Sequence, residues 1–227
     1  MKKAHVLNLL SRPELFQQVQ RDFAPFGVEC IREIGVSGVH PTPACTTGHL
    51  SFVKNAMREN WPFAVLLEDD CMPCPAMREW ESVSEYLLSH KKEWDLFYGG
   101  ATMVHPTKWI CGFQNSNVSI IQCKHALTVH FVIYNDSSFA KAIQWFELPE
   151  AEEKRPAIDT WLTNIGLRIW TTSPALAVQR PSFSNSLGKM ADYSEYFERS
   201  YLKLQDFIKL RRKSWTYRLF GKFLQGF

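Results

Sequence analysis

The feature that most constrains the fold is an apolar run that ends directly in three acidic residues. Residues 63–67 are continuously apolar, and Glu68-Asp69-Asp70 follows them without an intervening turn residue. A short apolar run of this kind predicts a β-strand that is buried on both faces, as in the parallel sheet of a three-layer α/β protein. Because such sheets bind ligands outside the carboxyl ends of their strands, the three acids are predicted to lie at a binding edge.

Apolar strands alternate with amphipathic helices along most of the chain, and this order predicts an α/β fold with a mostly parallel central sheet. Further strands are expected at residues 6–9, 27–31, 94–98, 126–134, 167–171 and 175–179. Helices are expected at residues 14–23, from Thr46 or Thr47 to a stop at residues 60–62, and at 77–90, 139–146 and 158–165. Residues 35–43 predict an irregular Gly- and Pro-rich loop, and residues 101–122 predict a hairpin.

The chain has 227 residues and 45% hydrophobic content, enough for one substantial core, so we expect one domain at residues 1–200 and a tail at residues 201–227. It shows no export signal and no run of about 18 uncharged apolar residues, which favours a cytoplasmic location. A net charge of +3 does not by itself argue for nucleic acid. The six cysteines are expected to be reduced, because Cys71 and Cys74 lack a second close pair to complete a zinc site.

The acidic triplet predicts a divalent metal site. Carboxylates crowded at the end of a buried strand repel one another, and a bound cation offsets that repulsion. Oxygen ligands favour Mn²⁺ or Mg²⁺, and such a metal bridges a diphosphate and takes up the charge that develops on a leaving nucleotide. The alternative is a solvated acidic turn that caps the next helix.

Five short motifs follow one another in order between residues 4 and 190. They lie at residues 7–12, 44–50, 65–70, 156–162, and 174–179 together with 184–186. This ordered set resembles the motifs of family 25 glycosyltransferases, which include lipopolysaccharide-core and procollagen galactosyltransferases. The resemblance implies a GT-A-like three-layer fold, a nucleotide-sugar donor that is most often UDP-linked, and inversion at the anomeric carbon.

Carried over position by position, the resemblance implies a metal site and a donor site. Asp70 would be the main metal ligand, Asp69 would assist directly or through water, and Glu68 would lie nearer the ribose. Asn8 and Arg12 would lie beside the nucleotide base and phosphates.

A predicted helix and a glycine pair supply further donor-site candidates. Thr47, His49 and Lys54 lie on a helix whose N-terminal amides suit a diphosphate, although they would also serve as surface or core residues. Gly99 and Gly100 would let the backbone approach the donor sugar closely, or would simply mark a turn.

Asp159 is the candidate base that deprotonates the acceptor hydroxyl, because it lies at the start of a predicted helix. Its alternative role is that of a first-turn acid that stabilises the helix. Asp95 is a second candidate that also suits the edge of a strand. We expect Gln179, Ser184 and Ser186 to line the acceptor or metal side of the site.

The chain departs from the pattern of many GT-A enzymes, which complete the metal site with a histidine late in the sequence. The last histidine here is His130, so an oxygen or amide ligand, or water, would have to fill that position. His125 and His130 are expected to pack or to form hydrogen bonds within the fold.

The tail from residue 201 interleaves basic and aromatic residues. This mixture predicts an interfacial helix at the inner face of a membrane, near a glycolipid acceptor such as lipopolysaccharide. Packing of the aromatic face on the domain is the alternative. A phage-type enzyme that glycosylates modified DNA bases would also use a basic, aromatic surface.

The sequence therefore favours a hexosyltransferase that uses a UDP-sugar and builds a surface glycan. A non-catalytic module that binds nucleotide sugars or glycans is an alternative of a different class. A metal-dependent phosphodiesterase or nuclease is a third, and it would require a second set of acids and a histidine close by.

Overall fold

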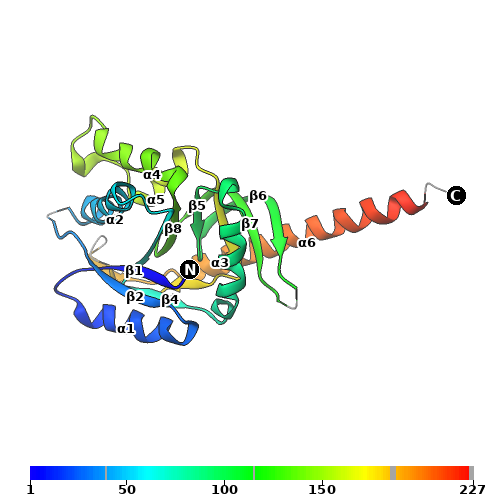
Figure 1. Ribbon diagram of the computed structural model, residues 1–227, viewed down its shortest axis with the longest axis horizontal. Coiled ribbons are helices and arrows are strands. Elements are labelled where there is room, and N and C mark those ends of the chain that lie inside the picture. The colour runs from blue at the N-terminus through cyan, green and yellow to red at the C-terminus, as the bar shows by residue number, and fades with distance from the viewer. Residues whose placement is uncertain (39, 115, 185–187, 225–227) are drawn as a thin grey trace.

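Six of the eight strands in the described part of the central sheet run in the same direction, and β7 and β8 run against them (Figure 1). The computed structural model describes residues 1–38, 40–114, 116–184 and 188–224, with side chains up to residue 212 apart from that of Ser184. The strand order is β2-β1-β3-β8-β5-β9-β7-β6. The strands are β1 Lys3–Asn8, β2 Glu29–Ile34, β3 Phe63–Glu68, β5 Leu96–Tyr98, β6 Thr102–Gly112, β7 Ser119–Leu127, β8 Phe131–Asn135 and β9 Ile169–Ser173.

Helices cover both faces of the sheet, which completes three layers (Figure 1). The helices α1 Pro13–Phe23 and α3 Trp80–Ser89 pack on one face. The other face is covered by α2 Pro41–Arg58, α4 Asp136–Ile143, α5 Ile158–Asn164 and the first part of α6 Ser194–Leu224. The predicted α/β class and three-layer sandwich with a mostly parallel sheet are confirmed.

Strand β3 lies in the middle of these layers, and its side chains alternate between two cores. Ala64 and Leu66 belong to the core under α2, whereas Val65 and Leu67 belong to the core under α1 and α3. All four are at most 4% exposed. The prediction of a strand buried on both faces is confirmed, and it places the acidic triplet at the carboxyl end of β3 beside β1.

The remaining elements are short. Strand β10 Ala177–Gln179 pairs antiparallel with β4 Cys71–Pro73, which carries the chain on from the acidic triplet, and β11 Ser182–Ser184 pairs with β12 Lys189–Ala191. The short 3₁₀ helices are η1 Ala24–Phe26, η2 Pro75–Glu79, η3 Lys91–Glu93, η4 Gln144–Glu147 and η5 Glu152–Lys154.

Several predicted boundaries differ from the structure, and two of them differ for a clear physical reason. Helix α2 begins at Pro41 and not at Thr46 or Thr47, because prolines at residues 41 and 43 fit the first turn, where a backbone N–H has no helical partner. The strand expected at residues 126–134 is two strands, β7 and β8, separated by Thr128, whose φ of 74° interrupts the extended backbone.

Helix α6 begins inside the predicted domain and continues past its expected end at residue 200. It packs on the domain through the buried residues Phe197, Leu204 and Ile208 and through Arg212, which lies over Trp109 of β6, and its last turns project away from the sheet (Figure 1). No helix in the described ranges combines the length and apolar character needed to cross a membrane.

Candidate active site

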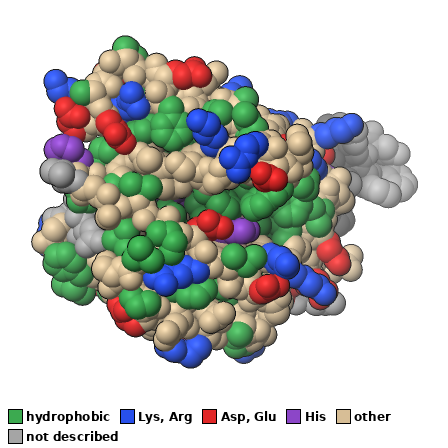
Figure 2. Space-filling view, turned by 60° about the vertical axis from the view of Figure 1, so that its left-hand side comes forward, with side chains coloured by type: hydrophobic (Ala, Val, Ile, Leu, Met, Phe, Trp, Pro, Cys, Tyr) green, Lys and Arg blue, Asp and Glu red, His purple; other side chains and the backbone are tan. Residues whose placement is uncertain are grey.

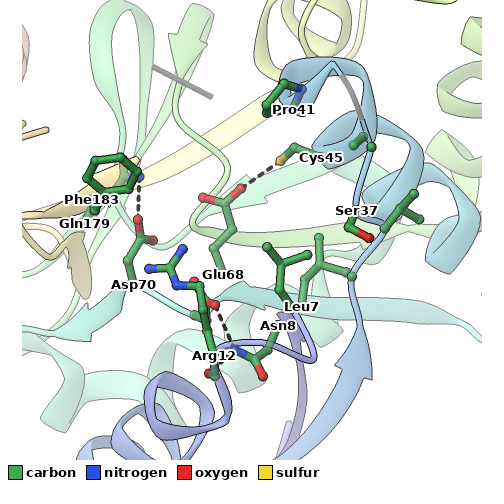
Figure 3. A pocket seen from close by; sticks show the side chains of 16 residues that line it. Leu7, Asn8, Arg12, Ser37, Pro41, Cys45, Glu68, Asp70, Gln179 and Phe183 are labelled. Atoms are coloured by element: carbon green, nitrogen blue, oxygen red, sulfur yellow. Dashed lines mark hydrogen bonds between the residues drawn. The ribbon is translucent and has the colours of Figure 1, made fainter. Parts of the chain in front are cut away.

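Two cavities meet at the carboxyl end of β3. The first cavity, of about 390 Å³, is bounded by the end of β1, Arg12, the loop at residues 35–38 and the acidic triplet (Figure 3). The second cavity, of about 450 Å³, is bounded by α2, residues 127–129, the start of α5 and the start of α6. Cys45, Glu68 and Gln179 line both cavities, so the triplet stands at their junction.

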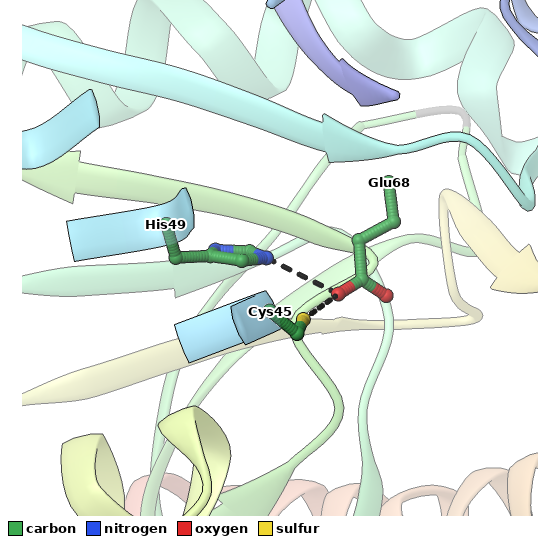
Figure 4. Close-up of side chains that lie close together, drawn as sticks. All are labelled: Cys45, His49 and Glu68. Atoms are coloured by element: carbon green, nitrogen blue, oxygen red, sulfur yellow. Dashed lines mark hydrogen bonds and ion pairs between the residues drawn. The ribbon is translucent and has the colours of Figure 1, made fainter. Parts of the chain in front are cut away.

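Glu68 is oriented from behind by two residues of α2 (Figure 4). Its Oε1 lies 3.1 Å from His49 Nε2 and accepts a hydrogen bond from Cys45 Sγ at 3.5 Å. Burial raises the pKa of the Glu68 carboxyl, but the hydrogen bond and charge of His49 outweigh burial and leave that pKa lowered. Glu68 is therefore held as a carboxylate at the junction.

His49 itself is fully buried, with its other ring nitrogen Nδ1 3.2 Å from the Tyr134 hydroxyl. Cys45, His49 and Glu68 form a group in which one ligand atom of each lies within 4.8 Å of the others. Burial, reinforced by the charge of Glu68, holds the pKa of the Cys45 thiol well above its usual range. Since metals bind the thiolate, this group acts as a hydrogen-bonded support for Glu68.

Asp70 lies on the same side of the strand end, two residues further on (Figure 3). Its Oδ2 accepts hydrogen bonds from Gln179 Nε2 at 2.8 Å and Ser182 Oγ at 3.4 Å, while its buried Oδ1 has no partner among the described residues. Burial, and then the neighbouring Glu68 carboxylate, raise the pKa of Asp70 to about 7. The Gln179 hydrogen bond and the Arg12 charge therefore offset the effect of burial and of Glu68 only in part.

Asp69 points toward β1. Its Oδ2 accepts a hydrogen bond from Asn8 Nδ2 at 2.8 Å, and Arg12 lies close enough to oppose the rise in pKa that burial causes. Asn8 is itself held by Arg32, whose Nε donates to Asn8 Oδ1 at 2.8 Å. The predicted residues Asn8 and Arg12 thus meet the triplet in space, and both line the first cavity.

The donor atoms present fit a hard divalent cation. Glu68 and Asp70 offer carboxylate oxygens to one cavity, and Asp70 Oδ1 is buried without a partner in the described part of the chain. A cation such as Mn²⁺ or Mg²⁺ prefers oxygen ligands and would offset the repulsion between these two carboxylates.

Thr47 and Lys54 lie on α2 and contact side chains of η5 and η4. Thr47 Oγ1 donates to Glu152 Oε1 at 2.7 Å, and Lys54 Nζ lies over the Phe146 ring, 6.0 Å from its centroid. Together with His49, which lies behind Glu68, they are outside the lining of both cavities.

Gly99 and Gly100 follow β5, where the chain packs too tightly for a side chain. A Cβ at Gly99 would lie 2.2 Å from the Phe131 ring, and one at Gly100 would lie 2.1 Å from the carbonyl oxygen of Ala177. The close approach at this glycine pair is therefore between two protein segments, and neither residue lines the two cavities.

The two candidate bases lie at different ends of the sheet. Asp159 is in the first turn of α5 and lines the second cavity, and its Oδ1 accepts from the Thr160 backbone N–H at 2.7 Å. Asp95 precedes β5 and is held by Arg168, whose Nε and Nη2 donate to its two oxygens at 2.9 and 2.7 Å. The alternative of Asp95 as the base is wrong, because this carboxylate is committed to an ion pair away from the triplet.

The other predicted residues have mixed outcomes. Gln179 contacts Asp70, whereas the side chain of Ser184 and all of Ser186 lie outside the described residues. His130 is buried beside the carbonyl of Ala177, and burial lowers the pKa of its imidazole to about 4. A neutral ring that donates its Nε2–H to that carbonyl confirms the structural role expected of His130. All six cysteines are free thiols.

Several residues of the site were missed from the sequence. Cys45 lies in a predicted motif, but its contact with Glu68 depends on how α2 packs on β3. Ser182 and Phe183 follow β10 and reach the first cavity only because β10 pairs with β4, the strand that begins directly after Asp70. Tyr193 lies just before α6 and Tyr196 lies in its first turn, and both line the second cavity.

No protein-family model matches the sequence, and no curated protein matches it significantly. Among solved structures, the chain is similar to a mannose-1-phosphate geranyltransferase from Thermus thermophilus, with 10% identity and a TM-score of 0.43 over 75% of this chain and 73% of that one. A glycosyltransferase involved in glycosylation of the major capsid of PBCV-1 aligns with 7% identity and a TM-score of 0.36. The alignment covers 62% of this chain and 63% of that one.

A Drosophila β1,4-galactosyltransferase 7 variant in complex with manganese, UDP-Gal and xylobiose aligns with 11% identity and a TM-score of 0.36, over 86% of this chain and 72% of that one. Similarity at these identities and TM-scores does not by itself define a family or an activity.

Proposed function

We propose that this chain is a metal-dependent, inverting glycosyltransferase of the GT-A type, similar to family 25. In this proposal it transfers a hexose from a UDP-sugar to a hydroxyl of a glycan or glycolipid such as lipopolysaccharide. The observation that carries the proposal is the junction at the end of β3, where Glu68 and Asp70 face one cavity with Arg12 and share it with Asn8.

The chemistry of the first cavity supports a nucleotide diphosphate as its ligand. Its volume of about 390 Å³ lies in the range of small-molecule sites. Arg12 supplies a cation near the carboxylates, and the loop at residues 35–38 brings backbone groups to the same wall. Asp70 would hold the metal, with Asp69 assisting directly or through water. Glu68, which the resemblance placed nearer the ribose, is proposed here as a further ligand because it lines the same cavity as Asp70. When bound, this metal would neutralise the diphosphate and the charge that develops on the leaving nucleotide.

The second cavity supports the acceptor role of Asp159. This carboxylate shares the cavity with Glu68 and Gln179, which also line the donor side. A base in this position would take the proton from the acceptor hydroxyl as that oxygen attacks the anomeric carbon. His49, whose Nε2 lies beside Glu68, is buried with both ring nitrogens in hydrogen bonds, which disfavours the nuclease alternative.

Thermal stabilisation tests the donor assignment. UDP-, GDP- and dTDP-sugars with Mn²⁺ should be screened, and one of them should raise the melting temperature, because a ligand that binds only the folded state stabilises it. EDTA should abolish that rise. An unchanged melting temperature with every donor, with and without EDTA, would contradict the proposal. In Asp70→Asn, the Mn²⁺-dependent part of the rise in melting temperature should be lost. Asp206→Asn, which changes an exposed residue of α6, serves as the control.

An Asp159→Asn variant separates an enzyme from a binding module. An enzyme should lose turnover by roughly 10²-fold or more while keeping its affinity for the donor, since general-base catalysis contributes about 10²–10⁴-fold. A binding module has no turnover to lose. Turnover should be followed by mass spectrometry of the released nucleotide.

We further propose that the tail brings the enzyme to anionic lipid. The support is compositional: basic and aromatic residues are interleaved from residue 201 to residue 227, and the last turns of α6 project from the domain (Figure 1). Within the described side chains, Arg211 lies over Phe207 of the same helix, whereas Arg212 lies over Trp109 of β6 and so packs on the domain. Basic groups beside aromatic rings suit a headgroup region.

A further inference from the structure

We propose that the second cavity binds a neutral carbohydrate acceptor, with Tyr193 and Tyr196 as the surface on which a sugar ring packs. This inference rests on the proposed function, because it names the acceptor class for the same site. The second cavity lies beside the first and shares Glu68 and Gln179 with it, and it contains Asp159. An acceptor placed there would present a hydroxyl between the proposed base and the donor.

The aromatic wall comes from the start of α6. The Tyr193 and Tyr196 rings lie 6.2 Å apart between centroids, with 53° between their planes, and Tyr196 is 48% exposed. Met103, which is 56% exposed, adds an apolar surface from β6. One face of a pyranose ring carries mainly C–H groups, whose positive edges match the negative face of an aromatic ring.

The polar groups of the cavity suit the rest of such a ligand. Thr42, Thr46, Thr102 and Thr128 place hydroxyls or backbone groups on its lining. A sugar displays hydroxyls around the edge of its ring, and pockets orient their ligands by a few polar groups of this kind within a largely apolar wall.

Charge distinguishes a neutral glycan from a nucleic acid. Among the described residues that line the second cavity, Glu68 and Asp159 are acidic and none is Lys or Arg. A phosphodiester backbone would be repelled by these carboxylates, and its binding normally depends on Lys and Arg. On the face shown in Figure 2, basic side chains are interspersed with acidic ones. The cavity therefore favours an uncharged sugar over DNA.

Backbone strain is concentrated in the same cavity. Met103 and Thr128 line it and have positive φ angles of 50° and 74°, although neither is glycine. For a β-branched residue such as Thr128 this conformation is unfavourable, and strain of this kind gathers at functional sites. The Thr128 backbone N–H points to Asp159 Oδ2 at 3.5 Å. The strained turn thus helps to position the proposed base against the acceptor.

Saccharide binding tests this inference without requiring a donor. Saturation-transfer NMR should be recorded on the full chain with octyl β-galactoside, octyl β-glucoside and octyl β-mannoside, and fluorescence anisotropy with a labelled DNA duplex. We expect at least one glycoside to bind, Tyr196→Ala to weaken its binding roughly tenfold, and Tyr196→Phe to retain it, because the ring face supplies the contact. Tyr201→Ala is the matched control, since Tyr201 is an exposed tyrosine of α6 outside this cavity.

The outcomes separate the two proposals. Failure of every nucleotide sugar to bind would contradict the proposed function. The glycoside experiment would still show whether the second cavity binds a neutral saccharide. The inference is overturned if none of the three glycosides binds, if Tyr196→Ala binds the preferred glycoside as tightly as the unaltered chain, or if the DNA duplex binds in this cavity and displaces the glycoside.

Discussion

His49 illustrates how a residue can support a candidate site without lining its cavities. The sequence motif suggested a donor contact, but the ring is buried between Tyr134 and Glu68 and bonds to both. A neighbour that orients a carboxylate affects any metal that the carboxylate binds, because it fixes the direction of the oxygen lone pairs. We therefore assign His49 as a positioning residue for Glu68.

A His49→Phe variant tests this assignment. The ring volume is nearly kept, but Glu68 Oε1 loses a hydrogen bond, so Mn²⁺ affinity in the presence of the donor should fall roughly 10–100-fold. Free Mn²⁺ can be measured by electron paramagnetic resonance, with circular dichroism to check folding. Tyr134→Phe removes the hydroxyl on the far side of His49 and should have a smaller effect. Unchanged Mn²⁺ affinity in His49→Phe would refute the positioning role.

Gly100 has a packing role that can be tested by stability. In Gly100→Ala, the added Cβ would meet the Ala177 carbonyl oxygen at 2.1 Å, and backbone cannot move aside as a flexible side chain does. We expect a loss of about 3 kcal/mol in the free energy of unfolding, measured by urea denaturation. Gly38→Ala should change it by less than about 0.5 kcal/mol, since its Cβ would lie 3.5 Å from Ala44. Equal stability of the two variants would contradict this packing.

At the scale of elements, local signals placed the strands well and their ends poorly. The apolar run at residues 63–67 predicted β3, which the structure extends by one residue, because continuous burial depends on side chains that are read directly from the sequence. The break at Thr128 was missed, since a β-branched residue is expected to continue a strand. Tertiary contacts around Asp159 override that local preference.

The amino end of β5 is joined to β9 by the Asp95 and Arg168 ion pair. Asp95 is 7% exposed, and its oxygens also accept hydrogen bonds from the Arg168 backbone N–H and from Ser137. Burial opposes ionisation, but these hydrogen bonds and the Arg168 charge outweigh it and lower the pKa of Asp95 from 3.8 to about 2. A lowered carboxyl pKa stabilises the folded state wherever the carboxyl is ionised in both states.

We expect Asp95→Asn to reduce the free energy of unfolding by about 2 kcal/mol at neutral pH. The contribution is complete above the unfolded pKa of 3.8 and is lost as pH falls through about 2, so the difference between variant and unaltered chain should shrink across that interval. Urea denaturation at several pH values measures it. A difference that stays constant from pH 7 to pH 2 would show that the loss does not arise from this carboxylate.

At the scale of the whole molecule, the sheet order brings the site together. β8 inserts antiparallel between β3 and β5, which sets the connection at residues 128–130 beside the end of β3. α5 and the start of α6 then close the second cavity from the other side. The site therefore draws on segments from the first strand to the last helix.

The projecting end of α6, beyond Arg212, provides a test at this scale. Removal of residues 213–227 should leave the melting temperature nearly unchanged, because the buried anchors Leu204 and Ile208 remain. The full chain should cosediment with phosphatidylglycerol vesicles at low salt and much less with phosphatidylcholine vesicles, and the truncated chain should not cosediment. Equal cosedimentation of the two chains would show that the tail is not the lipid contact.

The sequence by itself determined the α/β class, the buried strand and the position of its acidic end, because burial and periodicity are properties of short segments. It also indicated Asn8, Arg12, Asp159 and Gln179 as residues that would meet near that end, and the structure places all four on the two cavities. Only the tertiary structure decided that all three acids line the first cavity, that Asp69 bonds to Asn8 there, and that Tyr196 lines the second cavity. These are consequences of strand order and helix packing, which arise from contacts between residues far apart in the chain.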